Sequence, residues 1–406
     1  MRKALHYTLL TISILLLSIA LLWCLGLWVY QPISLIPVAL LLAAWGAWYA
    51  KRKQYPGHTL LWLWGLVLLN IVTFKLIPGP QPEKWQTPWA VAPQFSFSED
   101  GNLLTIANIR DFEYRTEHDY TPRYRTETYD LRTITGADFA ACHWDGMETV
   151  CHTMMSFSFA DGRHLVVSAE TRLPEGEEQT AIGGLYKRYG ILYLFGTEED
   201  IFGLRTNYRH EDLMLMPLKA TPEHARTMLL NFVALQQAAA TNHTAYNTVA
   251  DNCSTGVINT FRTIAPNMPW YYNLLPIHNG DIARVLFKHG AVRTIPGESF
   301  EQFRKRCYLG YDPAPNTAPS YSKALRDKIK REDPPLPPPP STPLGVLHCG
   351  PGPLFISHRK VASSLRRSRS SLRAQASIQT TAGDNSRALQ LVSCVVSYEL
   401  RHPGTP

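Results

Sequence analysis

Three long apolar runs in the first eighty residues constrain the fold of this chain more than any other feature. They cover residues 5–30, 33–50 and 60–77. A bilayer core about 30 Å thick takes roughly 20 helical residues, so each run, with its flanks, is long enough to cross a membrane. The first run is too long for a signal peptide and lacks an Ala-x-Ala cleavage site. We therefore predict a three-helix transmembrane anchor over residues 1–80, in preference to buried helices of a soluble domain.

Positive charges in the short loops orient this anchor. Arg2 and Lys3 precede the first run and the Lys-Arg-Lys triplet at 51–53 precedes the third, whereas the link between the first two runs is uncharged. Loops rich in Lys and Arg stay in the cytoplasm, so the N-terminus is predicted to be cytoplasmic. Everything after about residue 76 then lies on the other side. In a bacterium this is a multi-pass inner-membrane protein with a periplasmic C-terminal domain.

The end of the chain differs in composition from its middle. Residues 334–340 are nearly all proline, and a Ser/Arg-rich stretch with few aromatics follows. Such a stretch buries too little apolar area to offset its ordering entropy, so we predict a disordered tail over 334–406 and one folded domain over 81–333. Of the formal charge of +7, the tail holds eight Arg and Lys against two acidic residues. The body is almost neutral, which argues against a nucleic-acid partner.

The order of expected elements in the middle segment indicates an α+β fold. Strand-like patterns come first, over residues 103–114, 126–131, 150–170, 191–195 and 212–218. A helix is then expected to begin at Thr221-Pro222, where Thr suits the cap and Pro the first turn. Its apolar positions recur at helical spacing from Met228 to Leu235. Strands followed by helices favour α+β over a parallel, doubly wound sheet.

Four of the seven cysteines lie in the folded segment: Cys142, Cys151, Cys253 and Cys307. There is no Cys-x-x-Cys pair and no His-Glu-x-x-His motif, so the sequence predicts neither a metal nor another cofactor. In an oxidising periplasm, Cys142 and Cys151 could form a disulfide across a turn or remain buried thiols. Arg110, Asp111 and Arg205 fit a polar groove and exposed element faces equally well.

Cys253 has surroundings that suit a nucleophile. It follows Asp251-Asn252 and precedes Ser254-Thr255 and an apolar segment, so we expect it at the start of a helix. Unpaired amides and the helix dipole at such a start favour a thiolate and could stabilise an oxyanion. The alternative is a structural thiol, since cysteines at helix starts are not always reactive.

A nucleophilic thiolate needs an imidazole, and His152 is the best candidate. A three-residue loop at 160–162 pairs Met155 with Val167 and leaves one face of the hairpin apolar. In that register His152 lies opposite Glu170, which could orient the ring. A two-residue loop mixes apolar and polar side chains on both faces. The alternative for His152 is a structural role as a satisfied core residue, with Glu170 paired to Arg172.

Several spaced motifs resemble the Lnb N-terminal periplasmic domain family over about residues 90–330. They are Ile109-Arg110-Asp111-Phe112, Tyr129-Asp130-Leu131, His152-Thr153, Ser156-Phe157, Asp161-Gly162, Glu170-Thr171-Arg172, Tyr246-Asn247 and Asn252-Cys253-Ser254-Thr255. The order of His before Cys is also similar to the permuted papain-like (NlpC/P60-like) thiol enzymes. The resemblance implies Cys253 as nucleophile and His152 as general base, whereas Glu170 as third member follows from the hairpin register.

The family's naming member looks like a lipoprotein N-acyltransferase that uses a Cys and a His. The resemblance therefore implies a membrane-anchored cysteine acyltransferase that acts on phospholipid or lipoprotein substrates through a thioester. One alternative keeps the Cys and His but is hydrolytic, either a peptidoglycan amidase or peptidase, or a lipid esterase. The other is a non-catalytic envelope protein in which Cys253 is structural. The sequence names no protein partner.

Overall fold

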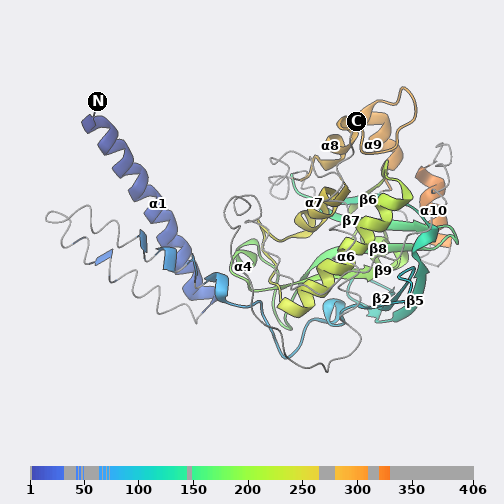
Figure 1. The fold of residues 1–406 in the computed structure, drawn as a ribbon, viewed down its shortest axis with the longest axis horizontal. Helices are drawn as coiled ribbons and strands as arrows, with labels where there is room; N and C mark the ends of the chain where they lie inside the picture. Colours follow the sequence, from blue (N-terminus) through green and yellow to red (C-terminus); the bar gives the residue numbers. More distant parts are fainter. Residues whose placement is uncertain are drawn as a thin grey trace, which may run out of the picture.

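The computed structural model describes residues 2–31, scattered positions of 43–49, most of 64–77, and residues 78–143, 149–264, 279–309 and 320–329. Helix α1 (Arg2–Tyr30) covers the first predicted apolar run and stands to one side of the sheet domain (Figure 1). Among the described residues, none of the helices combines the length and apolar character that a membrane crossing needs. The three-helix anchor therefore stays a prediction, and the predicted tail lies outside the described residues.

A mixed sheet forms the centre of the domain. Its strands lie in the order β1-β2-β9-β8-β7-β6-β10, and β5 pairs with the free side of β2. All neighbours are antiparallel except β2 and β9. The strands are β1 (Gln94–Phe97), β2 (Leu103–Arg110), β5 (Tyr124–Asp130), β6 (Ile134–His143), β7 (His152–Phe159), β8 (His164–Arg172), β9 (Gly190–Gly196) and β10 (Asp212–Pro217). This confirms the α+β prediction, while the papain-like permutation stays a prediction.

The hairpin of β7 and β8 has the predicted register. Met155 pairs with Val167 and Phe157 with Leu165, as a three-residue loop requires. Gly162 takes a φ of +84° in that loop, a conformation that costs glycine little. The Asp161 carboxylate accepts the Arg163 amide at 3.0 Å and closes the turn.

One face of the sheet is covered by α6 (Pro222–Asn242) and α7 (Cys253–Ile264), as Figure 1 shows. The Thr221 hydroxyl accepts the His224 amide, so the predicted helix start is confirmed. Phe232 lies 6.3 Å from Phe157 and 6.1 Å from Tyr193, measured between ring centroids. Burial of this apolar stripe against the sheet fixes α6 in place.

The opposite face is covered by α5 (Glu198–Gly203) and α10 (Ser320–Ile329), with Phe202 and Leu325 packed against Met154 and Leu194. Neither helix was expected, and β6 was also missed. The short helices α4 (Ala181–Leu185), α8 (Ile282–Lys288) and α9 (Phe300–Cys307) complete the larger described elements.

A buried ion pair fastens α10 to this second face. The Arg326 guanidinium contacts both carboxylate oxygens of Glu198 and lies 3.1 Å from Asp138. Glu198 and Asp138 are almost completely buried, at 0% and 1% exposure. Ser156 donates a further hydrogen bond of 2.6 Å to Glu198. One cation from a distant helix therefore contacts two buried carboxylates.

Replacing Arg326 with Met should lower the free energy of unfolding by about 3 kcal/mol, because two buried carboxylates lose their counter-ion. Denaturant titration of the full-length protein in detergent measures this change. Lys323→Met, on the exposed side of the same helix, is the matched control and should stay within about 0.5 kcal/mol of wild type. Equal losses of unfolding free energy in the two variants would contradict the role of Arg326 as the counter-ion of the buried carboxylates.

Candidate active site

Cys253 is the first residue of α7, as the sequence predicted, and Asn252 caps the helix. The Asn252 Oδ1 accepts the amides of Ser254 and Thr255, each at 3.0 Å. Asn252 itself is 4% exposed and donates to the Thr248 carbonyl at 2.8 Å. These two helix-start amides already have an acceptor. Because the capping side chain occupies them, these two amides do not support the predicted oxyanion site, which stays a prediction for the helix start.

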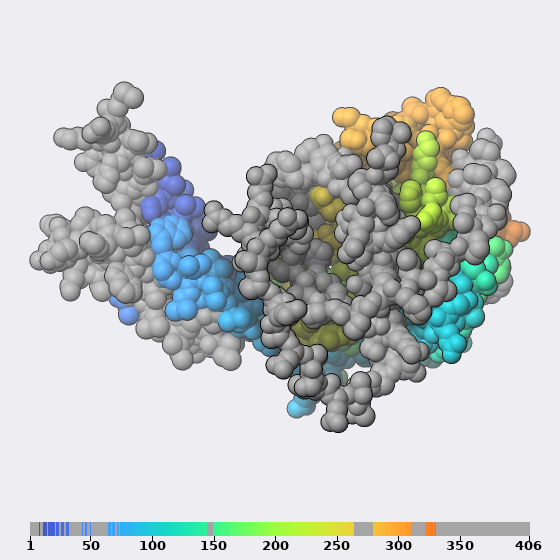
Figure 2. Space-filling view, in the orientation of Figure 1, coloured from blue at the N-terminus to red at the C-terminus, as the bar shows by residue number. Residues whose placement is uncertain are grey.

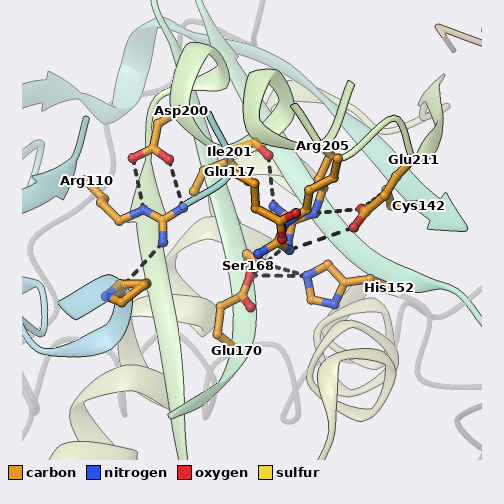
Figure 3. A network of polar contacts seen from close by, with 12 residues as sticks. Arg110, Glu117, Cys142, His152, Ser168, Glu170, Asp200, Ile201, Arg205 and Glu211 are labelled. Carbon is orange, nitrogen blue, oxygen red and sulfur yellow. Dashed lines mark hydrogen bonds and ion pairs between the residues drawn. The ribbon is translucent and has the colours of Figure 1, made fainter. Parts of the chain in front are cut away.

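His152 opens β7, and its ring meets Glu170 at the end of β8. The Nε2 atom lies 2.7 Å from the Ser168 hydroxyl and 3.3 Å from the Glu170 Oε1. Ser168 donates in turn to the same carboxylate oxygen at 2.6 Å. Figure 3 shows the three side chains converging, with Arg205 beyond them. Because Nε2 faces these partners, Nδ1 is the ring nitrogen left for a nucleophile.

The thiol of Cys253 lies near enough to the His152 ring for the charge of each group to shift the pKa of the other. Burial raises the pKa of the thiol, but the charge of His152, a hydrogen bond from the Thr153 amide and the nearby Ser254 hydroxyl outweigh it and bring the pKa to about 7. Burial of the ring opposes its protonation, but Glu170 and Cys253 raise the pKa of His152 to about 9. A thiolate–imidazolium pair is thus the main form between these two values.

The site lies at one end of the sheet. Cys253 packs against the apolar cluster on the α6 and α7 face. Ser168 pairs with Met154, whose side chain belongs to the cluster on the opposite face. His152, at the first position of its strand, therefore joins a sulfur on one face to a carboxylate on the other. Both His152 and Glu170 have side chains that are only 14% exposed.

Asn279 holds together the two segments that carry the sulfur and the ring. Its Oδ1 accepts the Cys151 amide at 2.7 Å, and its Nδ2 donates to the Cys151 carbonyl at 2.6 Å. The same amide group donates to the Ser254 hydroxyl. Cys151 directly precedes His152 and Ser254 directly follows Cys253, so one side chain, 2% exposed, links the backbone beside the ring to the side chain beside the thiol. Sequence reasoning missed Asn279, and no motif surrounds it.

Arg205, which the sequence left without a role, lies behind Glu170. It is 5% exposed, and its Nη2 donates to the Glu170 Oε1 at 3.1 Å. Burial would raise the pKa of the Glu170 carboxyl, but His152, Arg205 and Ser168 hold it well below its usual range. Arg110, by contrast, binds Asp200 through two hydrogen bonds of 2.9 and 2.8 Å and has no contact with Cys253 among those found.

The other cysteines of the described residues do not share these properties. Cys142 and Cys151 are both buried and reduced, so the disulfide alternative is wrong. Burial raises the pKa of each, and Glu211, which accepts a 2.9 Å hydrogen bond from the Cys142 thiol, raises that of Cys142 further. Within the part of the chain that the structure describes, no three His, Cys, Asp or Glu side chains gather to hold a metal ion.

Comparison with known protein families covers the part of the chain that contains the site. Residues 120–287 match the model of the Lnb N-terminal periplasmic domain family, so the predicted resemblance is confirmed there. This segment is similar to the Lnb N-terminal periplasmic domain. No curated protein and no solved structure matches the chain. The matched residues contain Cys253, His152 and Glu170, and the match supports a periplasmic envelope protein. The catalytic roles of these three residues and the NlpC/P60 likeness stay predictions.

Alkylation of Cys253 by iodoacetamide should rise with pH around a midpoint near 7, the pKa of this thiol. His152→Ala removes the neighbouring positive charge, so the midpoint should move to about 8.5 or above. Peptide mass spectrometry of the full-length protein follows Cys253 separately from the other thiols. His164→Ala, on the same hairpin, is the control and should leave the midpoint in place. A wild-type thiol that titrates like a denatured one would contradict the ion pair.

Asn279→Ala should lower both the stability of the protein and the alkylation rate of Cys253, because it breaks the link between the Cys151 backbone and the Ser254 hydroxyl. We expect a loss of about 2 kcal/mol, since buried partners are left without a hydrogen bond. Asn231→Ala is the matched control. Its Nδ2 bridges α6 and α7 through a 2.7 Å bond to Thr260, away from Cys253. Asn231→Ala should lower the stability of the protein and leave the alkylation rate of Cys253 unchanged. If both variants lowered both quantities, Asn279 would have no specific role at the site.

Proposed function

We propose that this protein is a membrane-anchored periplasmic cysteine acyltransferase that uses lipid and lipoprotein substrates. The observation that carries the proposal is the His152 ring held by Ser168 and Glu170, next to the Cys253 thiol whose pKa it lowers. The pKa of Cys253 is lowered, and Cys253 is the one thiol of the described residues that is not fully buried. A half-buried thiolate beside an imidazolium and an oriented carboxylate is the arrangement that acyl transfer through sulfur requires.

In the first half-reaction, the Cys253 sulfur forms a bond to the carbonyl carbon of a phospholipid ester. The ester C–O bond breaks, and His152 gives its proton to the leaving alcohol, which leaves a thioester and a neutral ring. In the second half, an amine such as a lipoprotein N-terminus attacks the thioester. The C–S bond breaks, the amine proton passes to His152, and the thiolate–imidazolium pair is restored.

The N-terminal helices support a membrane location for this chemistry. Helix α1 exposes large apolar side chains along its length, and residues 68–76 do the same; they are Ile12, Leu15, Leu16, Ile19, Leu22, Leu68, Leu69, Ile71, Val72 and Leu76. In the space-filling view the blue N-terminal residues project to one side of the sheet domain (Figure 2). Exposed apolar surface of this extent is typical of contact with lipid.

A packed joint connects these helices to the domain close to the site. The Tyr186 ring stacks on Tyr30 at 5.2 Å, and its hydroxyl lies where any side chain on Gly26 would clash. The Lys187 ammonium donates to the carbonyls of Phe74 and Ile77 at 2.8 and 2.6 Å. A domain fastened in this way would keep its nucleophile near the membrane surface.

The thioester provides the direct test. The full-length protein in phospholipid vesicles should gain one acyl chain on Cys253, detected by mass spectrometry and removed by hydroxylamine. A diacylglyceryl-cysteine peptide with a free amine should then accept that chain. Cys253→Ala should abolish both signals, whereas Cys307→Ala, which removes a buried thiol elsewhere, should keep them. Free fatty acid in place of acylated peptide would favour the hydrolase, and transfer that survives in Cys253→Ala would refute the proposal.

A further inference from the structure

The Glu170 carboxylate has two partners of opposite chemical behaviour. On one side lies His152, which gains and loses a proton in the proposed reaction. On the other lies Arg205, whose guanidinium stays charged at every pH that a protein tolerates. The Nη2 of Arg205 and the Nε2 of His152 lie 3.1 and 3.3 Å from the same Glu170 oxygen. The carboxylate therefore joins a titrating cation to a permanent one.

Each turnover of the proposed reaction leaves Glu170 beside a neutral ring. A buried carboxylate without a counter-ion takes up a proton, because burial disfavours the charged form. A protonated Glu170 would no longer attract the imidazolium, and the ring would lose its orienting acceptor. A cation that cannot titrate prevents this step. Resting on the proposed function, we propose that Arg205 is a positioning residue that keeps Glu170 ionised and aimed at His152 throughout the cycle.

Arg205 is itself held in one direction. Its Nη1 donates to the Ile201 carbonyl at 2.8 Å, and its Nε lies 3.8 Å from the Glu211 carboxylate (Figure 3). It lies in η4 (Leu204–Tyr208), a π-helical turn that follows α5 directly. Such turns widen a helix and are frequent at functional sites. This local departure from α-helix, together with full burial, marks Arg205 as more than a surface charge.

The charged and titratable groups around Arg205 come from several elements. They are Glu170 from β8, Glu211 before β10, Cys142 from β6 and Arg110 from β2. His152 reaches it through Glu170. Arg209, in the same turn region, lies 2.9 Å from Glu117 and 3.8 Å from Glu211. Removing the positive charge of Arg205 therefore makes every neighbouring group easier to protonate.

Arg205→Met should move the pH midpoint of Cys253 alkylation up by about one unit. It should also slow thioester formation at least about tenfold, because the ring loses its oriented carboxylate. Arg209→Met is the matched control and should change neither quantity. In a Glu170→Gln background, Arg205→Met should add almost nothing, since its target has gone. A purely structural arginine would instead lower stability equally in both backgrounds.

Arg205→Lys keeps the charge and loses the planar fork, so it serves where the Met variant does not fold. It should keep the wild-type midpoint and still slow thioester formation about tenfold. A Lys variant as fast as wild type, or a folded Met variant with an unchanged midpoint, would overturn the role of Arg205. Alkylation needs no acyl substrate, so it separates the two proposals. Slow alkylation of Cys253 in the wild-type protein would refute the proposed function. Fast alkylation in the wild type, with the same pH midpoint in the Arg205 variants, would refute this inference alone.

Discussion

A buried carboxylate needs a positive partner, and the site of this protein depends on how that need is met at Glu170. Its neighbours form a row of alternating charge that runs from Cys253 through His152, Glu170 and Arg205 to Glu211. The row crosses from α7 over β7 and β8 to η4. Each member stabilises the charge of the next, so the lowered pKa of the thiol reflects the whole arrangement rather than the helix start alone.

The parts of the site that could be predicted depend on neighbours in sequence. The alternation of apolar residues on either side of Gly162 fixes one hairpin register, and that register brings His152 to Glu170. The polar run before Cys253 predicts a helix start, which Asn252 provides. Burial of the capping side chain could not be predicted in the same way. The Asn252 side chain accepts the amides of Ser254 and Thr255, two of the helix-start amides that the sequence predicted as donors to an oxyanion.

The missing parts depend on contacts between distant segments. Asn279 is 128 positions from Cys151, and an asparagine has the same sequence signature in a loop and in a buried clamp. Strand β6 was missed because Gly136, Asp138 and Ala140 give neither alternation nor β-branched side chains. It nevertheless lies between β7 and β10, covered on both faces, where small residues leave room for the helices. Only the three-dimensional packing distinguishes such a strand from a loop.

The position of the site limits how a substrate can reach it. Cys253 and Glu170 belong to opposite faces of the sheet, so the thiol and the ring that Glu170 orients come together at the end where β7 begins. On the Cys253 side, Gly184 of α4 packs so closely on Tyr246 and Thr248 that a side chain there would clash. Two residues later Tyr186 packs on α1. The loop before the nucleophile and helix α1 thus pack against the same short segment, residues 184–186.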